Sequence, residues 1–147
     1  MSKKPFVSKE KLDEIAAQYA TPFYLYDEAA IRETARRVNK AFAWNQGFKE
    51  YFAVKATPNP AILKILHEEG CGADCSSYTE LQMADAVGFK GDEIMFSSNA
   101  TPAEDFQLAR QLNVTINLDD ITHIDFLEKV ADIPDTVSCR YNPGGHF

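Results

Sequence analysis

The chain has 147 residues, of which 22 are acidic and 15 basic, so its formal charge is −7. An acidic excess argues against nucleic acid as a partner. No apolar stretch approaches the length of a membrane span, and the polar start Met1–Lys4 leads into no apolar core of a secretory signal. The three cysteines lack the spacing of metal ligands, so no metal site is expected. These features predict a soluble, cytoplasmic protein without a membrane partner.

The first part of the chain divides into a lead and a helix. Residues 1–20 are interpreted as a polar lead with one or two helical turns, and residues 21–147 as the main unit. Within that unit Thr21–Asp27 is an extended apolar segment. From about Asp27 to Phe42 the apolar residues recur at helical spacing, which predicts an amphipathic helix.

A regular alternation of strands and helices follows. The predicted strands start about 21 residues apart: Tyr51–Lys55, Gly72–Ser76, Glu93–Ser97, Val114–Leu118 and Thr136–Tyr141. The predicted helices between them are Pro60–Glu69, Ser77–Val87, Pro102–Leu112 and Ile121–Val130. Short links between such elements indicate parallel strands joined by right-handed crossovers.

Such an α/β repeat suits a (β/α)8 barrel or an open doubly wound sheet. The turn after the first strand, Ala56–Pro60, contains no glycine, which disfavours a dinucleotide-binding sheet. Polar residues instead follow every strand: Lys55; Asp74 with Ser76 and Ser77; Ser97–Asn99; Asn117 with Asp119; and Arg140 with Asn142. The carboxyl ends of barrel strands form the rim on which active sites are built. The sequence therefore predicts about the first five βα units of a barrel.

Lys55 is the first candidate functional residue. It ends the apolar run Tyr51–Val54. Burying an ammonium group there costs free energy, unless the group has a function or the long side chain extends it to water. Desolvation at such a position lowers the pKa of a lysine and makes the amine a nucleophile. Alternation along the strand would place Ala53 and Lys55 inside the barrel, and Phe52 and Val54 against the helices. Cys75 and Cys139 are interpreted as strand core.

Four segments resemble a known family in order and spacing. They are TPFYLYDEAAIRE from Thr21, YFAVKATPNPAILKIL from Tyr51, EEGCGADCSSYTEL from Glu68 and CRYNPGG from Cys139. Together they closely resemble the amino-terminal half of diaminopimelate decarboxylases. More broadly they are similar to the pyridoxal-phosphate-dependent barrel enzymes that include ornithine, arginine and carboxynorspermidine decarboxylases. Alanine racemase shares this fold more distantly.

The resemblance implies a cofactor site. The lysine that matches Lys55 forms a Schiff base with pyridoxal 5′-phosphate, and the residues that match Asp74 and Arg140 lie beside the cofactor ring. From the residues alone, Asp74 could instead cap the following helix, and Arg140 could form an ordinary ion pair at the end of its strand.

The resemblance also implies a reaction, the decarboxylation of meso-diaminopimelate to L-lysine in lysine biosynthesis, by a homodimer of the full-length enzyme. The alternatives are another basic or polyamine substrate (carboxynorspermidine, ornithine or arginine), or a non-catalytic relative or fragment. A full barrel takes about 250 residues. The later strands of the family supply the phosphate-binding loops, so the chain alone is expected to be inactive and to hold the cofactor weakly.

Overall fold

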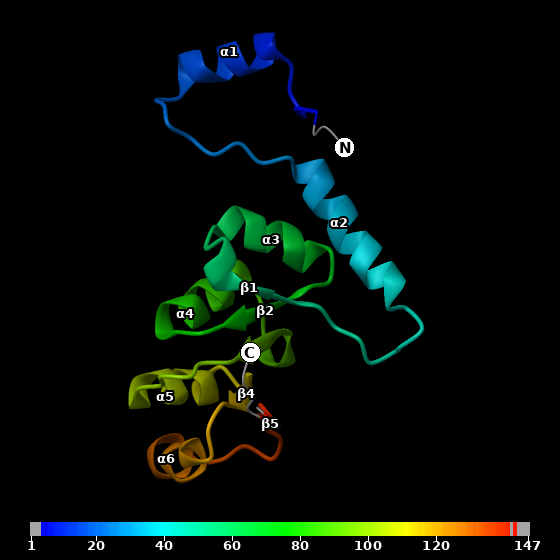
Figure 1. Cartoon of the computed structure of the whole chain (residues 1–147). Helices are drawn as coiled ribbons and strands as arrows, with labels where there is room; N and C mark the ends of the chain where they lie inside the picture. The colour runs from blue at the N-terminus through cyan, green and yellow to red at the C-terminus, as the bar shows by residue number, and fades with distance from the viewer. Residues whose placement is uncertain (1–3, 142, 144–147) are drawn as a thin grey trace.

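The computed structural model describes residues 4–141 and 143. Helix α1 (Lys9–Gln18) comes first and buries none of its side chains. Figure 1 shows α1 apart from the other helices, joined to α2 (Glu28–Ala41) by an extended segment. At 10 residues, α1 is longer than the one or two turns expected, because the Ser8 side chain caps it and Lys9 pairs with Asp13 one turn later.

Five parallel strands form one sheet in chain order, β1-β2-β3-β4-β5. Their bounds are Tyr51–Ala53, Gly72–Cys75, Ile94–Phe96, Thr115–Leu118 and Ser138–Cys139. The crossover helices are α3 (Pro60–Glu68), α4 (Tyr78–Val87), α5 (Ala103–Gln111) and α6 (Thr122–Ala131), and two short 3-10 helices, η1 (Val54–Ala56) and η2 (Gly91–Glu93), flank strands. Each crossover helix contacts the next along the sheet (Figure 1). The predicted parallel βα repeat is confirmed.

Capping groups at the starts of α3 and α4 explain how a short link can join each strand to the helix that follows it. The Asn59 side chain accepts a hydrogen bond from the Ala61 N–H at 2.9 Å, and Pro60 occupies the first position of α3. At α4 the Ser77 hydroxyl accepts from the Glu80 N–H, while the Glu80 carboxylate accepts from the Ser76 N–H at 2.7 Å. A helix therefore begins within three residues of the end of β2, which keeps the strand end close to the helix start.

The two faces of the sheet differ in chemistry. Pairing aligns Ala53, Asp74 and Met95 on one face, and their strand neighbours Phe52, Ala73 and Ile94 on the other. The second face packs under the helices and forms the main core, whose fully buried members include Val54, Leu63, Ala73, Cys75, Leu81, Ile94, Phe96, Phe106, Ile116 and Leu127. The apolar core thus lies between sheet and helices, and the first face carries the polar Asp74 beside the smaller or flexible Ala53 and Met95.

The structure corrects three expectations about strand ends. Strand β1 stops at Ala53, and Lys55 lies in η1 rather than in the strand. The Thr57 N–H donates to the Val54 carbonyl at 3.1 Å and so closes this turn, while the Val54 side chain stays fully buried in the core. Strand β5 keeps only Ser138–Cys139, and Cys139 is exposed rather than part of the core, because β5 is the edge of the sheet.

A cluster of charges ties α2 to α3. Glu69, whose side chain is only 8% exposed, lies between Arg32 (Nη1 to Oε1, 3.0 Å) and Arg36 (Nε to Oε2, 2.6 Å). Asn39 also donates to the Glu69 carbonyl at 2.9 Å. The Arg36 guanidinium, followed by that of Arg32, holds the pKa of the Glu69 carboxyl below its ordinary value. This cluster fixes the helix that leads into β1.

The Glu69 cluster predicts acid sensitivity. Replacing Glu69 with Gln should lower the free energy of unfolding at neutral pH, because the two guanidinium groups lose their shared carboxylate. A carboxyl with a lowered pKa stabilises the fold above its unfolded-state pKa, about 4.3 for Glu, and this contribution disappears as the pH falls through the lowered value. Urea denaturation should therefore show wild type and Glu69→Gln converging in acid. Glu33→Gln, on an exposed part of α2, is the control; a gap that persists in acid would contradict the assignment.

Candidate active site

The carboxyl ends of the strands form one rim of the sheet, as parallel pairing requires. Lys55 lies on this rim in η1, directly after β1, and its side chain is exposed. Turn η1 contacts β2, the neighbouring strand. Among the described residues, no hydrogen bond or ion pair engages the Lys55 ammonium group, so the amine is open to a ligand.

Asp74 lies on β2 next to Ala53 of β1, on the face opposite the core. Its Oδ1 accepts a hydrogen bond from the Ser97 hydroxyl at 2.5 Å. The helix that follows β2 is capped by Ser77, so the alternative role of Asp74 as a cap is wrong. The carboxylate is therefore held by the neighbouring strand rather than by the helix.

A second polar contact lies further along the rim. The Ser138 hydroxyl donates to Asn117 Oδ1 at 2.8 Å, and Asn117 is only 8% exposed. Within the described part of the chain, Asn117 Nδ2 and Ser76 Oγ are buried without a hydrogen-bond partner. Buried polar atoms nearly always have a partner, so these two atoms are open to a polar group from outside the described chain, such as water or a ligand.

Arg140 follows β5, and its backbone N–H donates to the Leu118 carbonyl at 2.9 Å. Its guanidinium pairs with Asp119 at 2.6 Å and is exposed. An ion pair at the strand end, the alternative that the sequence left open, is thus present. Arg140 shares the rim with Lys55, but β5 is three strands from β2, and no described contact joins Lys55, Asp74 and Arg140. Asn142, also expected on the rim, lies outside the described residues.

Cys75 is close to the rim in sequence but faces the core. Its side chain is fully buried, and burial, with smaller contributions from Glu80 and Asp74, raises the pKa of its thiol to about 12. The thiol therefore stays protonated at neutral pH and does not compete with the Lys55 amine as a nucleophile. Among the residues that the structure describes, no group of three His, Cys, Asp or Glu side chains could hold a metal ion.

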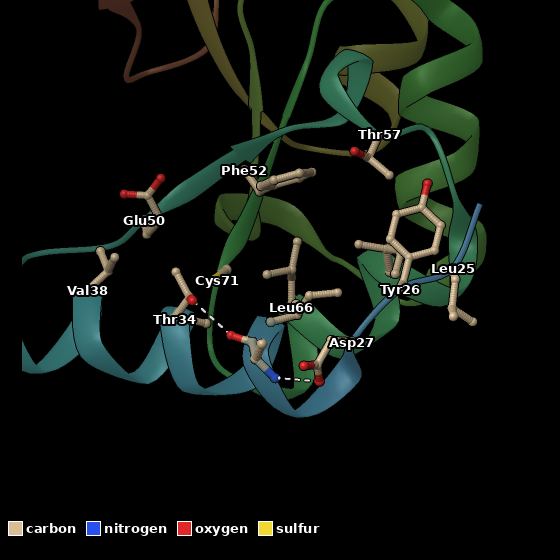
Figure 2. A pocket seen from close by; sticks show the side chains of 14 residues that line it. Leu25, Tyr26, Asp27, Thr34, Val38, Glu50, Phe52, Thr57, Leu66 and Cys71 are labelled. Carbon is tan, nitrogen blue, oxygen red and sulfur yellow. Dashed lines mark hydrogen bonds between the residues drawn. The ribbon is translucent and has the colours of Figure 1, made fainter. Parts of the chain in front are cut away.

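A large cavity lies away from this rim. It has a volume of about 580 Å³ and lies between α2, α3 and the core-facing side of β1. Figure 2 shows Phe52 and Leu66 lining it, with Val38 of α2 on another side. Its polar residues Asp27 and Thr34 are engaged with the backbone of Ala30. The lining is mainly apolar and lies beside the free edge of β1, which in an eight-stranded barrel meets the closing unit. Glu50 and Thr57 border it as well, so the cavity is a mainly apolar space with a few polar side chains in its wall.

Comparison with known proteins identifies the family. The sequence profile described as "Pyridoxal-dependent decarboxylase, pyridoxal binding domain" matches residues 28–146. The chain belongs to this family. Protein TabA of Pseudomonas amygdali pv. tabaci is 47% identical over 134 residues, which is 91% of this chain and 31% of the relative. The diaminopimelate decarboxylase of Methanothermobacter thermautotrophicus is 37% identical over 131 residues, or 88% of this chain and 31% of the relative.

Solved structures agree on the fold of this pyridoxal-binding domain. Diaminopimelate decarboxylase of Helicobacter pylori, complexed with L-lysine, is 32% identical with a TM-score of 0.70, over 81% of this chain and 30% of that one. Lysine decarboxylase of Selenomonas ruminantium has a TM-score of 0.77 at 23% identity, over 87% of this chain and 33% of that one, and shows the fold alone. The predicted barrel type is confirmed, and the chain spans about a third of the length of these relatives.

The rim fits the cofactor of the family, pyridoxal phosphate. The group needs a primary amine for covalent attachment and polar neighbours for its ring. Lys55 supplies an exposed amine, Asp74 a carboxylate, and Asn117 a buried amide N–H without a described partner. Ser97 and Asn117 were seen in the sequence only as polar residues at strand ends. Alternation along β3 and β4 could have placed both on the face of Asp74.

The difference in solvent exposure among the three thiols can be tested by alkylation. Cys139 is exposed, whereas Cys71 and Cys75 are buried and burial raises the pKa of both thiols. Iodoacetamide at mildly alkaline pH should label Cys139 first, and Cys75 only after unfolding in urea, as followed by peptide mass spectrometry. Rapid labelling of Cys75 in the folded chain would contradict its placement in the core.

Proposed function

We propose that the protein carrying this chain decarboxylates an amino acid with pyridoxal phosphate, and that the reaction is the conversion of meso-diaminopimelate to L-lysine. The observation that carries the proposal is the match of residues 28–146 to a pyridoxal-binding domain in which an exposed lysine, Lys55, directly follows the first strand. Asp74, on the adjacent strand, adds a carboxylate to the same rim.

The proposed roles follow from the chemistry of each group. When bound, pyridoxal phosphate supplies an electron sink for the electron pair that remains when carbon dioxide leaves. Lys55 attaches the cofactor through its Nζ and yields to the amine of the substrate. Asp74 places a negative charge beside the cofactor. Arg140, whose guanidinium pairs with Asp119 in the structure, would offer a hydrogen-bond donor to an anionic oxygen of the cofactor.

The choice of substrate rests on relatives. Several proteins named diaminopimelate decarboxylase are 30–37% identical to this chain, among them those of Methanothermobacter thermautotrophicus, Zymomonas mobilis and Archaeoglobus fulgidus. Protein TabA matches at 47% identity and its name states no reaction. Decarboxylation of a different amino acid is therefore the second candidate.

The same proposal covers the organisation of the protein. Residues 21–147 would form the first part of the barrel and residues 1–20 would lie outside it, which fits the absence of buried side chains in α1. Pairing of two copies of the whole enzyme rests on the family resemblance. In the described residues, no helix has the length and apolarity to cross a membrane.

Trapping the cofactor tests the site. The protein that carries this sequence within a complete barrel should be incubated with one equivalent of pyridoxal phosphate, reduced with borohydride and digested, and the label located by mass spectrometry. The label is expected on Lys55, and Lys55→Ala should abolish it. Lys64→Ala, on the exposed side of α3, is the matched control and should leave the label in place. A label on Lys49 or Lys64 would overturn the assignment.

Release of carbon dioxide tests the reaction. The protein that carries this sequence within a complete barrel should release carbon dioxide from meso-diaminopimelate faster than from L-ornithine or L-arginine. Lys55→Ala should remove nearly all turnover, because both the attachment point and a proton-carrying amine are lost. Equal rates on all three substrates would reject the substrate assignment. Full activity of Lys55→Ala would reject the mechanism.

A further inference from the structure

The contact between Ser97 and Asp74 joins two neighbouring strands on the polar face of the sheet. Asp74 aligns with Met95 of β3, and Ser97 is two residues further along the same chain. Alternation turns Ile94 and Phe96 into the core, where both are fully buried, and turns Ser97 to the side of Asp74. The 2.5 Å hydrogen bond is therefore a product of strand register.

The chemistry of this hydrogen bond leaves part of the carboxylate available. A serine hydroxyl has a single hydrogen to donate, and here that hydrogen goes to Oδ1. Among the described residues, Asp74 Oδ2 takes part in no hydrogen bond or ion pair. Asp74 is flanked by β3, which supplies Ser97, and by β1, which leads into Lys55. One oxygen is thus fixed from one side while the other stays open.

We propose that Ser97 is a positioning residue for Asp74, holding one carboxylate oxygen so that the other is presented to the cofactor on Lys55. The inference rests on the proposed function, in which the negative charge of Asp74 lies beside the bound cofactor. Ser97 itself needs no contact with the cofactor. Ser97 influences the cofactor only through Asp74. This dependence on Asp74 distinguishes Ser97 from a residue that merely supports the strand.

The chain offers a matched control. Ser138 also donates from the polar face to a side chain of the adjacent strand, but its acceptor is the Asn117 amide rather than a carboxylate. Ser138→Ala removes a hydroxyl of the same kind without touching Asp74. Ser97→Thr keeps the hydroxyl and should rescue what Ser97→Ala loses.

The first experiment needs no cofactor. In a chain labelled with ¹³C at the aspartate carboxyl carbons, the Asp74 resonance is assigned by its loss in Asp74→Asn. Exchange from H₂O to D₂O should shift this resonance through the bond from the Ser97 hydroxyl. The isotope shift should vanish in Ser97→Ala and persist in Ser97→Thr and Ser138→Ala. Its absence in the wild type would overturn the inference, whatever the chain does with cofactor.

The second experiment uses the protein that carries this sequence within a complete barrel, adds excess pyridoxal phosphate and follows the absorption band of the lysine-bound cofactor against pH. A nearby carboxylate favours the protonated, cationic form of the attachment, so Asp74→Asn should lower the midpoint by about one pH unit. Ser97→Ala should lower it in the same direction, by no more than that amount. In the Asp74→Asn background Ser97→Ala should have no further effect, because Ser97 acts only through that carboxylate.

The outcomes separate the two proposals. No Lys55-dependent band in the wild type would contradict the proposed function, and the role of Ser97 with it. A normal wild-type band with no shift in Ser97→Ala would contradict the role of Ser97 alone. An undiminished shift in the Asp74→Asn background would also overturn the inference, since it would show an effect of Ser97 that does not pass through the Asp74 carboxylate.

Discussion

Parallel pairing of the strands in chain order is the constraint on which the rest of this structure depends. Each strand runs in the same direction, so each delivers the residues that follow its last paired position to the same rim. Lys55, Ser97 and Arg140 come from three different strand ends, and no local segment of the chain could hold them together. Their common location is a property of the sheet.

The division between the two faces of the sheet makes this arrangement stable. Side chains such as Phe96 and Ile116 bury against the helices, and their apolar contacts hold the strands in register. Register then decides which polar groups meet on the other face, as it does for Ser97 with Asp74 and for Ser138 with Asn117. Packing on the core face of the sheet thus sets the positions of the polar side chains on the opposite face.

The sequence was sufficient to predict the repeat of strands and helices, because apolar spacing and capping residues such as Asn59 and Ser77 are local signals. It was insufficient for the ends of the strands. Strand β1 ends where its pairing with β2 ends and a turn closed by Thr57 begins, and whether Cys139 is core depends on which strand is the edge. Both are properties of the folded molecule.

The sequence proposes the members of the candidate site but does not give their contacts. Lys55, Asp74 and Arg140 were found from their positions after strands and from the family resemblance, and their roles toward the cofactor stay predictions. The hydrogen-bond and ion-pair partners of these residues were harder to predict. Arg140 pairs with Asp119 and Asp74 with Ser97, but the sequence contains several other polar groups that could have paired with either residue. Side-chain alternation narrows that choice only once the register is known.

Turn η1 makes a core residue part of the active-site geometry. Because Val54 is completely buried and its neighbour Lys55 is exposed, the direction of the lysine is set by how Val54 sits among the helices rather than by the pleat of β1. A change of side-chain shape at position 54 would rotate the turn and redirect the amine without altering any polar group. In this fold, the packing of a side chain without any polar atom therefore bears on where the candidate amine lies.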